Sequence, residues 1–231
     1  SMSTEPVLRL EAVKKAYDAP EGGRVEVLDV ERFEVARGEQ VALRGSSGSG
    51  KTTLLHIIAG IVKPDAGAVH VAGTDVARLG EAQRDHWRAK HVGYIYQSFH
   101  LLQGFTALEN IALAMKFGGR VDLARAKSLL EQVGLGARLN YKPRQLSIGQ
   151  QQRVAVARAL ANTPALVLAD EPTGNLDREH ADAALELILS LCKTSGAALL
   201  LVSHDERVVA RFPRVVDLAT LNRRAAAGAR A

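Results

Sequence analysis

Residues 41–60 read VALRGSSGSGKTTLLHIIAG, in which a short apolar run leads into G-x-x-x-x-G-K-T and then into a helical pattern. The motif requires a strand before it and a helix after it, and both patterns are present. Glycines at positions 45, 48 and 50 let the backbone turn tightly and direct N–H groups at phosphate oxygens. A Gly/Ser linker would not need Lys-Thr at this offset between two apolar elements. The segment therefore predicts a strand, a phosphate-binding loop and a helix.

The side chains of this loop carry more specific expectations. Lys51 is expected to reach the β- and γ-phosphates of a nucleotide, and Thr52 to offer its hydroxyl to Mg²⁺, which takes few protein ligands. The N-terminus of the following helix also favours an anion through its dipole. The residues expected to contact nucleotide here are Gly45, Ser46, Ser47, Gly48, Ser49, Gly50, Lys51, Thr52 and Thr53.

A second candidate site follows the apolar run in ALVLADEPTGNLD, residues 165–177. The run suits a buried parallel strand and ends in Asp170 and Glu171. Beside a phosphate loop, Asp170 is expected to hold the Mg²⁺ shell and Glu171 to polarise a water in line with the γ-phosphate. Two acids before Pro-Thr-Gly can also form a solvated turn. The presence of the phosphate loop is therefore what favours the functional interpretation of this acidic pair.

A third segment, LSIGQ at residues 146–150, places Ser147 three residues before Gln150. This is the spacing of a capping box, and the apolar residues that follow have helical spacing. The segment can therefore be an ordinary helix start. A helix N-terminus that carries a hydroxyl and a glycine is also suited to binding an anion.

The three segments, in this order and at this spacing, resemble the ATP-binding cassette (ABC) ATPases, and within them the small stand-alone subunits of the LolD, MacB and FtsE type. The resemblance extends from about residue 7 to residue 218. It implies an α/β P-loop NTPase fold with a mostly parallel core sheet, an antiparallel β layer and a helical subdomain. It also implies hydrolysis of ATP with Mg²⁺ in a head-to-tail homodimer. Each ATP would lie between one subunit's phosphate loop and the other subunit's signature segment.

Matched position by position, the resemblance implies further roles. Tyr17 falls where an aromatic ring stacks on adenine, although it can also be a plain edge residue. Gln97 falls at a glutamine that contacts Mg²⁺ or the attacking water, and His204, in LVSHD, at a switch histidine whose neutral imidazole can donate to the γ-phosphate. A lone histidine after an apolar run can instead be structural. The implied catalytic residues are Lys51, Gln97, Glu171 and His204, the implied metal ligands are Thr52, Gln97 and Asp170, and the implied trans contacts are Ser147, Gly149, Gln150 and Asp177.

The signature differs from the commonest form, LSGGQ, at Ile148. In the family, the groups that reach the γ-phosphate belong to the positions of Ser147 and Gly149. ATPase activity is therefore expected to survive the substitution.

The chain is expected to form a single ABC ATPase domain over residues 1–231. Its parts are a RecA-like core with the antiparallel layer (about 1–96 and 160–220), a helical subdomain (about 97–159) and a flexible tail (221–231). Within these, strands near 7–13 and 27–35 are expected to pair antiparallel, and strands ending at Gly45, Tyr96, Ala169 and Val202 to form the parallel core. In the subdomain, capping residues Thr106 and Asp122 predict two helix starts.

Composition agrees with a compact chain, because 231 residues of which 47% are hydrophobic can bury a sizeable core. No apolar run approaches the ~20 residues that span a bilayer. The single cysteine, Cys192, excludes an intramolecular disulfide and indicates a reducing compartment. The net charge of +5 is spread along the chain, so no specific nucleic acid is expected. Arg223, Arg224 and Arg230 either contact lipid headgroups or belong to a frayed end.

The expected function is that of an ATP-hydrolysing subunit which drives a separate membrane permease, for export or force transmission, from the cytoplasmic face of the inner membrane. In the family, a groove in the helical subdomain takes a coupling helix of the permease. The candidate groove residues, which can equally be core, are Phe99, Leu101, Leu102, Phe105 and Leu108. One alternative is a soluble ATPase clamp or scaffold, although clamps usually carry two cassettes or a long coiled coil. A P-loop kinase ranks last, and the cargo is not encoded in this subunit.

Overall fold

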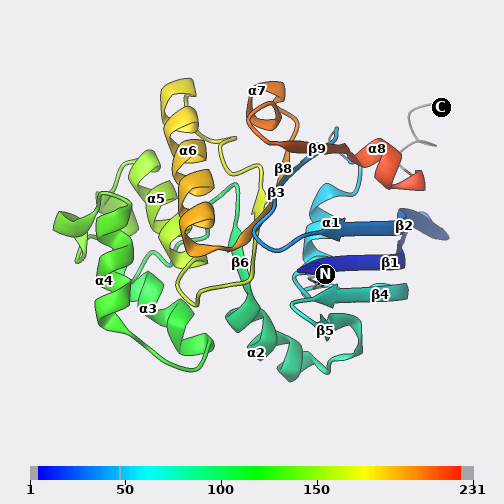
Figure 1. Cartoon of the computed structure of the whole chain (residues 1–231), viewed down its shortest axis with the longest axis horizontal. Helices are drawn as coiled ribbons and strands as arrows, with labels where there is room; N and C mark the ends of the chain where they lie inside the picture. Colours follow the sequence, from blue (N-terminus) through cyan, green and yellow to red (C-terminus); the bar gives the residue numbers. More distant parts are fainter. Residues whose placement is uncertain (1–4, 47, 225–231) are drawn as a thin grey trace.

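A five-stranded sheet runs through the middle of the computed structural model, which describes residues 5–46 and 48–224 (Figure 1). Its strand order is β6-β7-β8-β3-β9, and each neighbouring pair is parallel. The carboxyl ends of these strands therefore meet at one edge, where open α/β sheets bind ligands. The strands are β3 (Gln40–Arg44), β6 (Val92–Ile95), β7 (Leu166–Asp170), β8 (Ala198–Ser203) and β9 (Arg214–Asp217).

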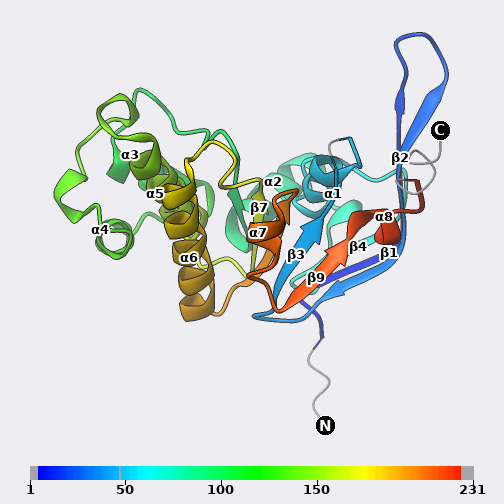
Figure 2. The ribbon, with the colours of Figure 1, turned by 90° about the horizontal axis from the view of Figure 1, so that it is seen from above.

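A second, antiparallel sheet has the order β2-β1-β4-β5. The expected pairing of the first two strands is confirmed, and both are longer than predicted. Seen from above, the hairpin between them projects well beyond the rest of the sheet (Figure 2). The strands are β1 (Leu8–Asp18), β2 (Arg24–Val35), β4 (Ala66–Val71) and β5 (Thr74–Asp75). Strands β4, β5 and β9 were not among the predicted elements.

Helices cover the parallel sheet and form a separate layer at the end away from the antiparallel sheet (Figure 1). That layer contains α3 (Ala107–Phe117), α4 (Leu123–Gln132) and α5 (Ile148–Ala159). The others are α1 (Lys51–Ile58), α2 (Glu81–His91), α6 (Arg178–Ser195), α7 (Glu206–Val209) and α8 (Leu218–Leu221), with short 3-10 turns at Val76–Arg78, Gly136–Arg138 and Pro143–Gln145.

The helix starts in this layer follow the predicted capping chemistry. Thr106 Oγ1 accepts the Glu109 N–H, and the Glu109 carboxylate accepts the Thr106 N–H at 2.7 Å, which completes a capping box at α3. Asp122 accepts from the Arg125 N–H at the start of α4. Helix α3 ends at Phe117, and Gly118 is its C-cap. Local sequence therefore placed these helix ends, because each cap satisfies N–H groups that the helix itself leaves unpaired.

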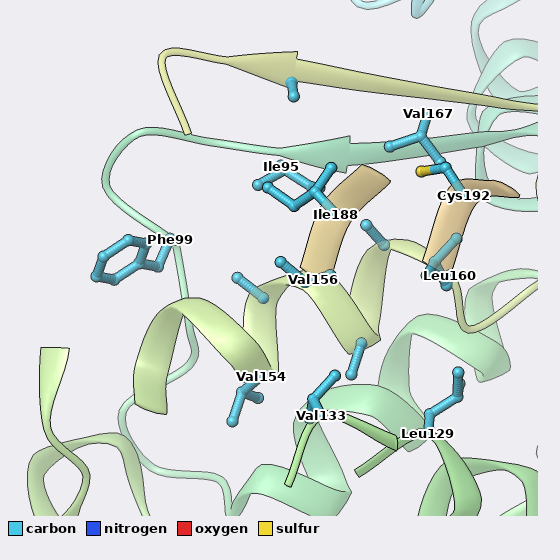
Figure 3. Close-up of a cluster of buried hydrophobic side chains, with 14 of the residues drawn as sticks. Ile95, Phe99, Leu129, Val133, Val154, Val156, Leu160, Val167, Ile188 and Cys192 are labelled. Atoms are coloured by element: carbon cyan, nitrogen blue, oxygen red, sulfur yellow. The ribbon is translucent and has the colours of Figure 1, made fainter. Parts of the chain in front are cut away.

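The core consists of two apolar clusters, one on each face of the parallel sheet. All six residues of β8 are buried, and its side chains alternate between the two clusters, with Leu199 and Leu201 in one and Leu200 and Val202 in the other. The first cluster also packs α5 and α6 against β6 and β7 (Figure 3).

The groove candidates separate into buried and exposed residues. Phe99 and Leu101 are buried in the first cluster, and Leu108 packs against it. Leu102 and Phe105 are each 43% exposed. The sequence did not decide whether these five residues form a groove or belong to the core, and the structure places three of them in the core.

Residues 221–224 were expected to belong to a flexible tail, but they contact the rest of the fold, and residues 225–231 lie outside the described residues. Leu221 is the last residue of α8, and Asn222 is completely buried. Arg223 and Arg224 form ion pairs with Glu31 and Glu26 of β2, so these two arginines face protein carboxylates. Arg230 lies outside the described residues. Among the described helices, none combines the length and apolar character needed to cross a bilayer.

Cys192 provides a test of the packing around α6. Burial raises the pKa of its thiol to about 12, so at pH 8 the thiolate that reacts with alkylating reagents is scarce. Iodoacetamide should label the native protein at least roughly a hundredfold more slowly than the urea-unfolded chain, because an unfolded thiol titrates near ~8.5 and is accessible. Mass spectrometry of timed samples measures both rates. Equal rates would contradict the buried position.

Candidate functional site

A cleft of about 990 Å³ opens at the carboxyl edge of the parallel sheet, between the loop after β3 and the ends of β7 and β8. Most of the predicted site residues line it. These are Gly45, Ser46, Gly48, Ser49, Gly50, Lys51, Thr52, Thr53, Gln97, Asp170, Glu171 and His204. Ser47 lies outside the described residues. Segments far apart in the sequence therefore converge because their strands are parallel neighbours.

The loop between β3 and α1 adopts a conformation that requires glycine. Gly48 and Gly50 have φ values of 78° and 91°, in the left-handed region that other residues rarely adopt. A Cβ added to Gly45 would lie 2.8 Å from Ser49 Oγ, so the loop also closes tightly on itself. The Ser49 hydroxyl donates to the Ser46 carbonyl at 2.7 Å. These contacts define the compact turn that the glycine spacing predicted.

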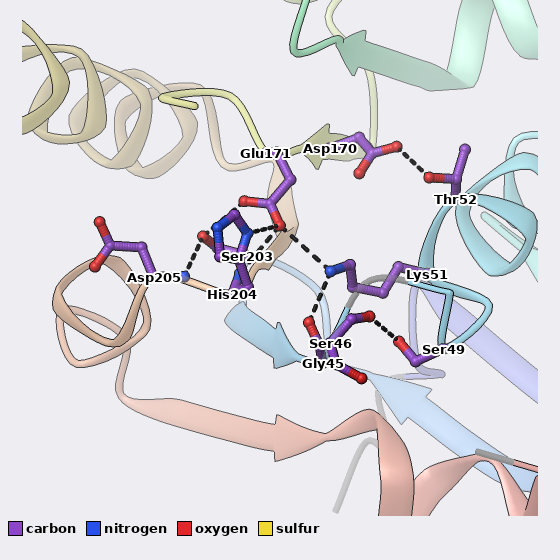
Figure 4. Close-up of polar contacts among 10 residues, drawn as sticks. All are labelled: Gly45, Ser46, Ser49, Lys51, Thr52, Asp170, Glu171, Ser203, His204 and Asp205. Carbon is purple, nitrogen blue, oxygen red and sulfur yellow. Dashed lines mark hydrogen bonds and ion pairs between the residues drawn. The ribbon is translucent and has the colours of Figure 1, made fainter. Parts of the chain in front are cut away.

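Lys51 bends back over this loop toward the acidic strand end (Figure 4). Its ammonium donates to the Gly45 carbonyl at 2.7 Å and lies 3.4 Å from Glu171 Oε1. The side chains of Lys51 and Glu171 are only 10% and 12% exposed, so each charge offsets the other in a poorly solvated place.

The Glu171 carboxylate is held from several sides. Ser203 Oγ donates to Oε2 at 2.9 Å, and the His204 backbone N–H donates to Oε1 at 3.1 Å. His204 Nδ1 lies 2.6 Å from the same Oε1. Glu171 itself has φ 44°, a strained value for a residue with a side chain, and its N–H donates to the Val202 carbonyl. Surrounding structure therefore over-determines where this carboxylate points.

Asp170 and Thr52 form the second polar pair of the cleft. Thr52 Oγ1 donates to Asp170 Oδ2 at 2.9 Å, which connects the start of α1 to the end of β7. Desolvation raises the pKa of Asp170, the nearby Glu171 charge adds to the rise, and the Thr52 hydrogen bond opposes it. A hydroxyl and a carboxylate oxygen side by side suit a hard cation such as Mg²⁺. In the described part of the chain, no group of three or more His, Cys, Asp or Glu side chains is arranged to hold a metal.

Gln97 reaches the cleft from the loop after β6. Its backbone carbonyl accepts a hydrogen bond of 2.9 Å from the Asn175 side-chain amide. Gly174 approaches so closely that an added Cβ would lie 2.9 Å from Gln97 Nε2. The loop that follows Glu171 therefore fixes the Gln97 segment.

The signature residues do not line this cleft. Ser147 and Gln150 make the predicted capping box at the start of α5, with hydrogen bonds of 3.1 and 3.3 Å. Ile148 is 57% exposed and takes no part in the cap. The structure thus places the hydroxyl and the glycine of this segment at the start of α5, outside the cleft that holds the phosphate loop of the same chain.

Asp177 and Tyr17 also lie outside the cleft lining. Asp177 caps α6 by accepting the His180 N–H, and its carboxylate contacts His180 Nδ1 at 2.8 Å. The His180 ring also lies against Gly149, where an added Cβ would be 3.1 Å from Cδ2. Tyr17 is 41% exposed on the β1–β2 hairpin, with the Lys15 ammonium 5.4 Å from its ring centroid. The stacking of Tyr17 on adenine stays a prediction.

Sequence reasoning missed several residues around the cleft. Ser203 holds Glu171, and its signal was its place directly before the predicted switch histidine. Arg44, which immediately precedes the loop, lies 3.1 Å from Asp217 and 3.3 Å from Glu206, and all three line the cleft. No motif marked the two acids, because they enter through β9 and α7.

Comparisons with known proteins agree with this geometry. The family model described as ABC transporter matches residues 28–174. The lipoprotein-releasing system ATP-binding protein LolD of Xylella fastidiosa strain 9a5c is 47% identical over 219 residues, which cover 93% of this chain and 90% of the relative. The protein of the same name from Novosphingobium aromaticivorans is 46% identical and covers 93% and 97%.

The chain belongs to the ABC transporter family. Among solved structures, a dimeric post-hydrolysis state of the ATP-binding cassette MJ0796 bound to ADP and Pi superposes with a TM-score of 0.82 at 35% identity, over 91% of this chain and 93% of that one. The expected fold class is confirmed. This ABC transporter subunit is an ATPase.

The Ser203 contact gives a test of how Glu171 is held. Ser203→Ala removes one hydrogen-bond donor from the buried Glu171 carboxylate. A hydrogen bond to a charged group contributes about 1.5–3 kcal/mol. Its loss should also disturb the orientation of the carboxylate. The kcat for ATP should fall roughly tenfold while KM changes far less, because Glu171 is expected to act on the hydrolytic step.

Phosphate-release kinetics measure both constants. Ser195→Ala is the matched control, since that hydroxyl donates only to the Cys192 carbonyl near the end of α6. An unchanged kcat in Ser203→Ala would show that Glu171 does not depend on this donor.

Proposed function

We propose that two copies of this chain close head to tail around two ATP molecules and drive a membrane permease that releases lipoproteins. The observation that carries the proposal is the split of the motifs. The cleft gathers the phosphate loop, Asp170, Glu171 and His204, whereas Ser147 and Gly149 lie at the start of α5, outside the cleft lining. A second copy supplies them in the sandwich. The lipoprotein assignment rests on relatives named for a lipoprotein-releasing system.

In this site, the chain's own groups divide the work of phosphoryl transfer. Thr52 and Asp170 would hold Mg²⁺ together with the nucleotide phosphates, and the ion would supply neutralisation of developing charge. Lys51 binds the phosphates, which releases it from its present pairing with Glu171. Glu171, held by Ser203 and the His204 backbone, accepts a proton from the attacking water.

His204 connects the two ends of this arrangement. Its Nδ1 lies against Glu171 while its side chain is 69% exposed to the cleft side. The other ring nitrogen is therefore available to the γ-phosphate, and the Nδ1 contact fixes which way the ring faces.

Glu171→Gln tests the sandwich. The amide keeps the shape of the side chain but cannot accept the proton, so ATP should persist and hold two chains together. Light scattering with Mg-ATP should give the dimer mass for Glu171→Gln and a smaller average mass without nucleotide. Glu186→Gln, an exposed change on α6, is the control and should behave as wild type. A Glu171→Gln protein that stays monomeric at every concentration would overturn the sandwich.

A groove of about 720 Å³ beside α3 is the proposed seat of the permease's coupling helix. It is lined by Tyr94, Tyr96, His100 and Phe117, and the two tyrosine rings stack with centroids 4.0 Å apart. Tyr96 immediately precedes Gln97, so one short segment reaches both the groove and the nucleotide cleft. Aromatic side chains in a lining that also includes Asp85, Arg88 and Arg158 suit an amphipathic helix, which has an apolar and a polar face.

Phe117→Glu tests this seat. Phe117 is 65% exposed at the groove, and a charge there should abolish co-purification of a permease from native membranes solubilised with Mg-ATP. Leu123→Glu is the matched control, because Leu123 is 53% exposed on α4 and is not part of the groove lining. Recovery of only soluble partners with the unmodified chain would instead favour an ATPase clamp.

The proposed location is the cytoplasmic face of the inner membrane.

A further inference from the structure

Asn222 follows α8 and is completely buried, although its side chain is polar. It does not line the nucleotide cleft but lies behind the phosphate loop. Its backbone N–H donates to the Leu218 carbonyl at 2.7 Å, which fixes the residue at the end of the helix. A fully buried amide side chain demands partners, and these partners connect three parts of the chain.

The side-chain amide of Asn222 is saturated with backbone partners. Nδ2 donates to the Val27 carbonyl at 2.8 Å and to the Ser49 carbonyl at 3.2 Å. Oδ1 accepts from the Asp29 N–H at 2.9 Å and from the Arg224 N–H at 3.2 Å. One side chain therefore binds β2 twice and the phosphate loop once.

The contact with Ser49 bears directly on the phosphate loop. A trans peptide is planar, so its carbonyl and the next N–H point in opposite directions. Because Asn222 draws the Ser49 carbonyl toward the buried side, the Gly50 N–H is directed away from that side. Gly50 lines the cleft and is the N-cap of α1, where amides meet an anion.

The packing around Gly50 and Gly45 leaves the loop little freedom to replace this contact. A Cβ on Gly50 would lie 2.9 Å from Leu28 Cδ2 and 3.4 Å from Asn222 Nδ2. A Cβ on Gly45 would lie 3.2 Å from Leu218 Cβ. Residues 218–222 thus form the rear wall of the loop.

We infer that Asn222 is a positioning residue for ATP binding, which orients the Ser49–Gly50 peptide of the phosphate loop and locks it to β2. The inference concerns nucleotide binding by a single chain. It depends neither on the proposed dimer nor on the permease.

Asn222→Asp is the sharpest variant, because it keeps size and the two accepted bonds but replaces the Nδ2 donor with an acceptor facing two carbonyls. Asn222→Ala removes all four bonds. Titration with N-methylanthraniloyl-ATP should show a Kd raised roughly tenfold or more in both, since a misdirected loop amide no longer meets phosphate. Hydrogen exchange of a peptide covering residues 49–54 should accelerate in the same variants.

Asn110→Ala is the matched control. Asn110 is 2% exposed and likewise bonds only to backbone, at Leu102, Phe105 and Thr106 in the helical layer. It should lower Tm comparably and leave Kd unchanged, which separates loss of stability from loss of positioning. If Asn222→Ala does not fold, Asn222→Asp and Asn222→Ser are compared at low temperature. Folded Asn222 variants that bind the ATP analogue within twofold of wild type would overturn the inference.

Discussion

Parallel pairing of β7, β8 and β3 is the constraint on which the cleft depends. Each strand ends at the same edge, so Asp170, His204 and the loop after Arg44 are brought together by backbone register and not by their own attraction. The apolar clusters on both faces of the sheet hold that register, because a shift by one residue would exchange the faces of every side chain. The polar side chains at this edge are thus positioned by the buried apolar core.

Electrostatic interactions determine how the charged side chains at this edge are arranged in the absence of nucleotide. Burial raises the pKa of Asp170, and Glu171 would add a second negative charge beside it. Lys51 and the hydrogen-bond donors around Glu171 offset this charge. Lys51 already lies in the cleft and is paired with the Glu171 carboxylate. Incoming phosphate groups can replace that carboxylate as the partner of the ammonium group.

Much of the fold and most of the cleft could be predicted, because those parts are encoded locally. Capping boxes at Thr106 and Ser147, and glycines that must adopt positive φ, are short-range signals. Ser203 and Asn222 could not be predicted in the same way, since their roles exist only where distant segments meet. Strand β9 escaped notice because its four residues carry little pattern and owe their conformation to pairing with β3.

The position of β3 has a consequence for how the protein is made. In the five-stranded sheet it pairs only with β8 and β9, which come from the last part of the described chain. While a ribosome is still synthesising the earlier residues, the strand that leads into the phosphate loop has no neighbour in that sheet. In that sheet β3 therefore gains its neighbours only after β8 and β9 have been synthesised, and until then an apolar strand is left for chaperones to shield.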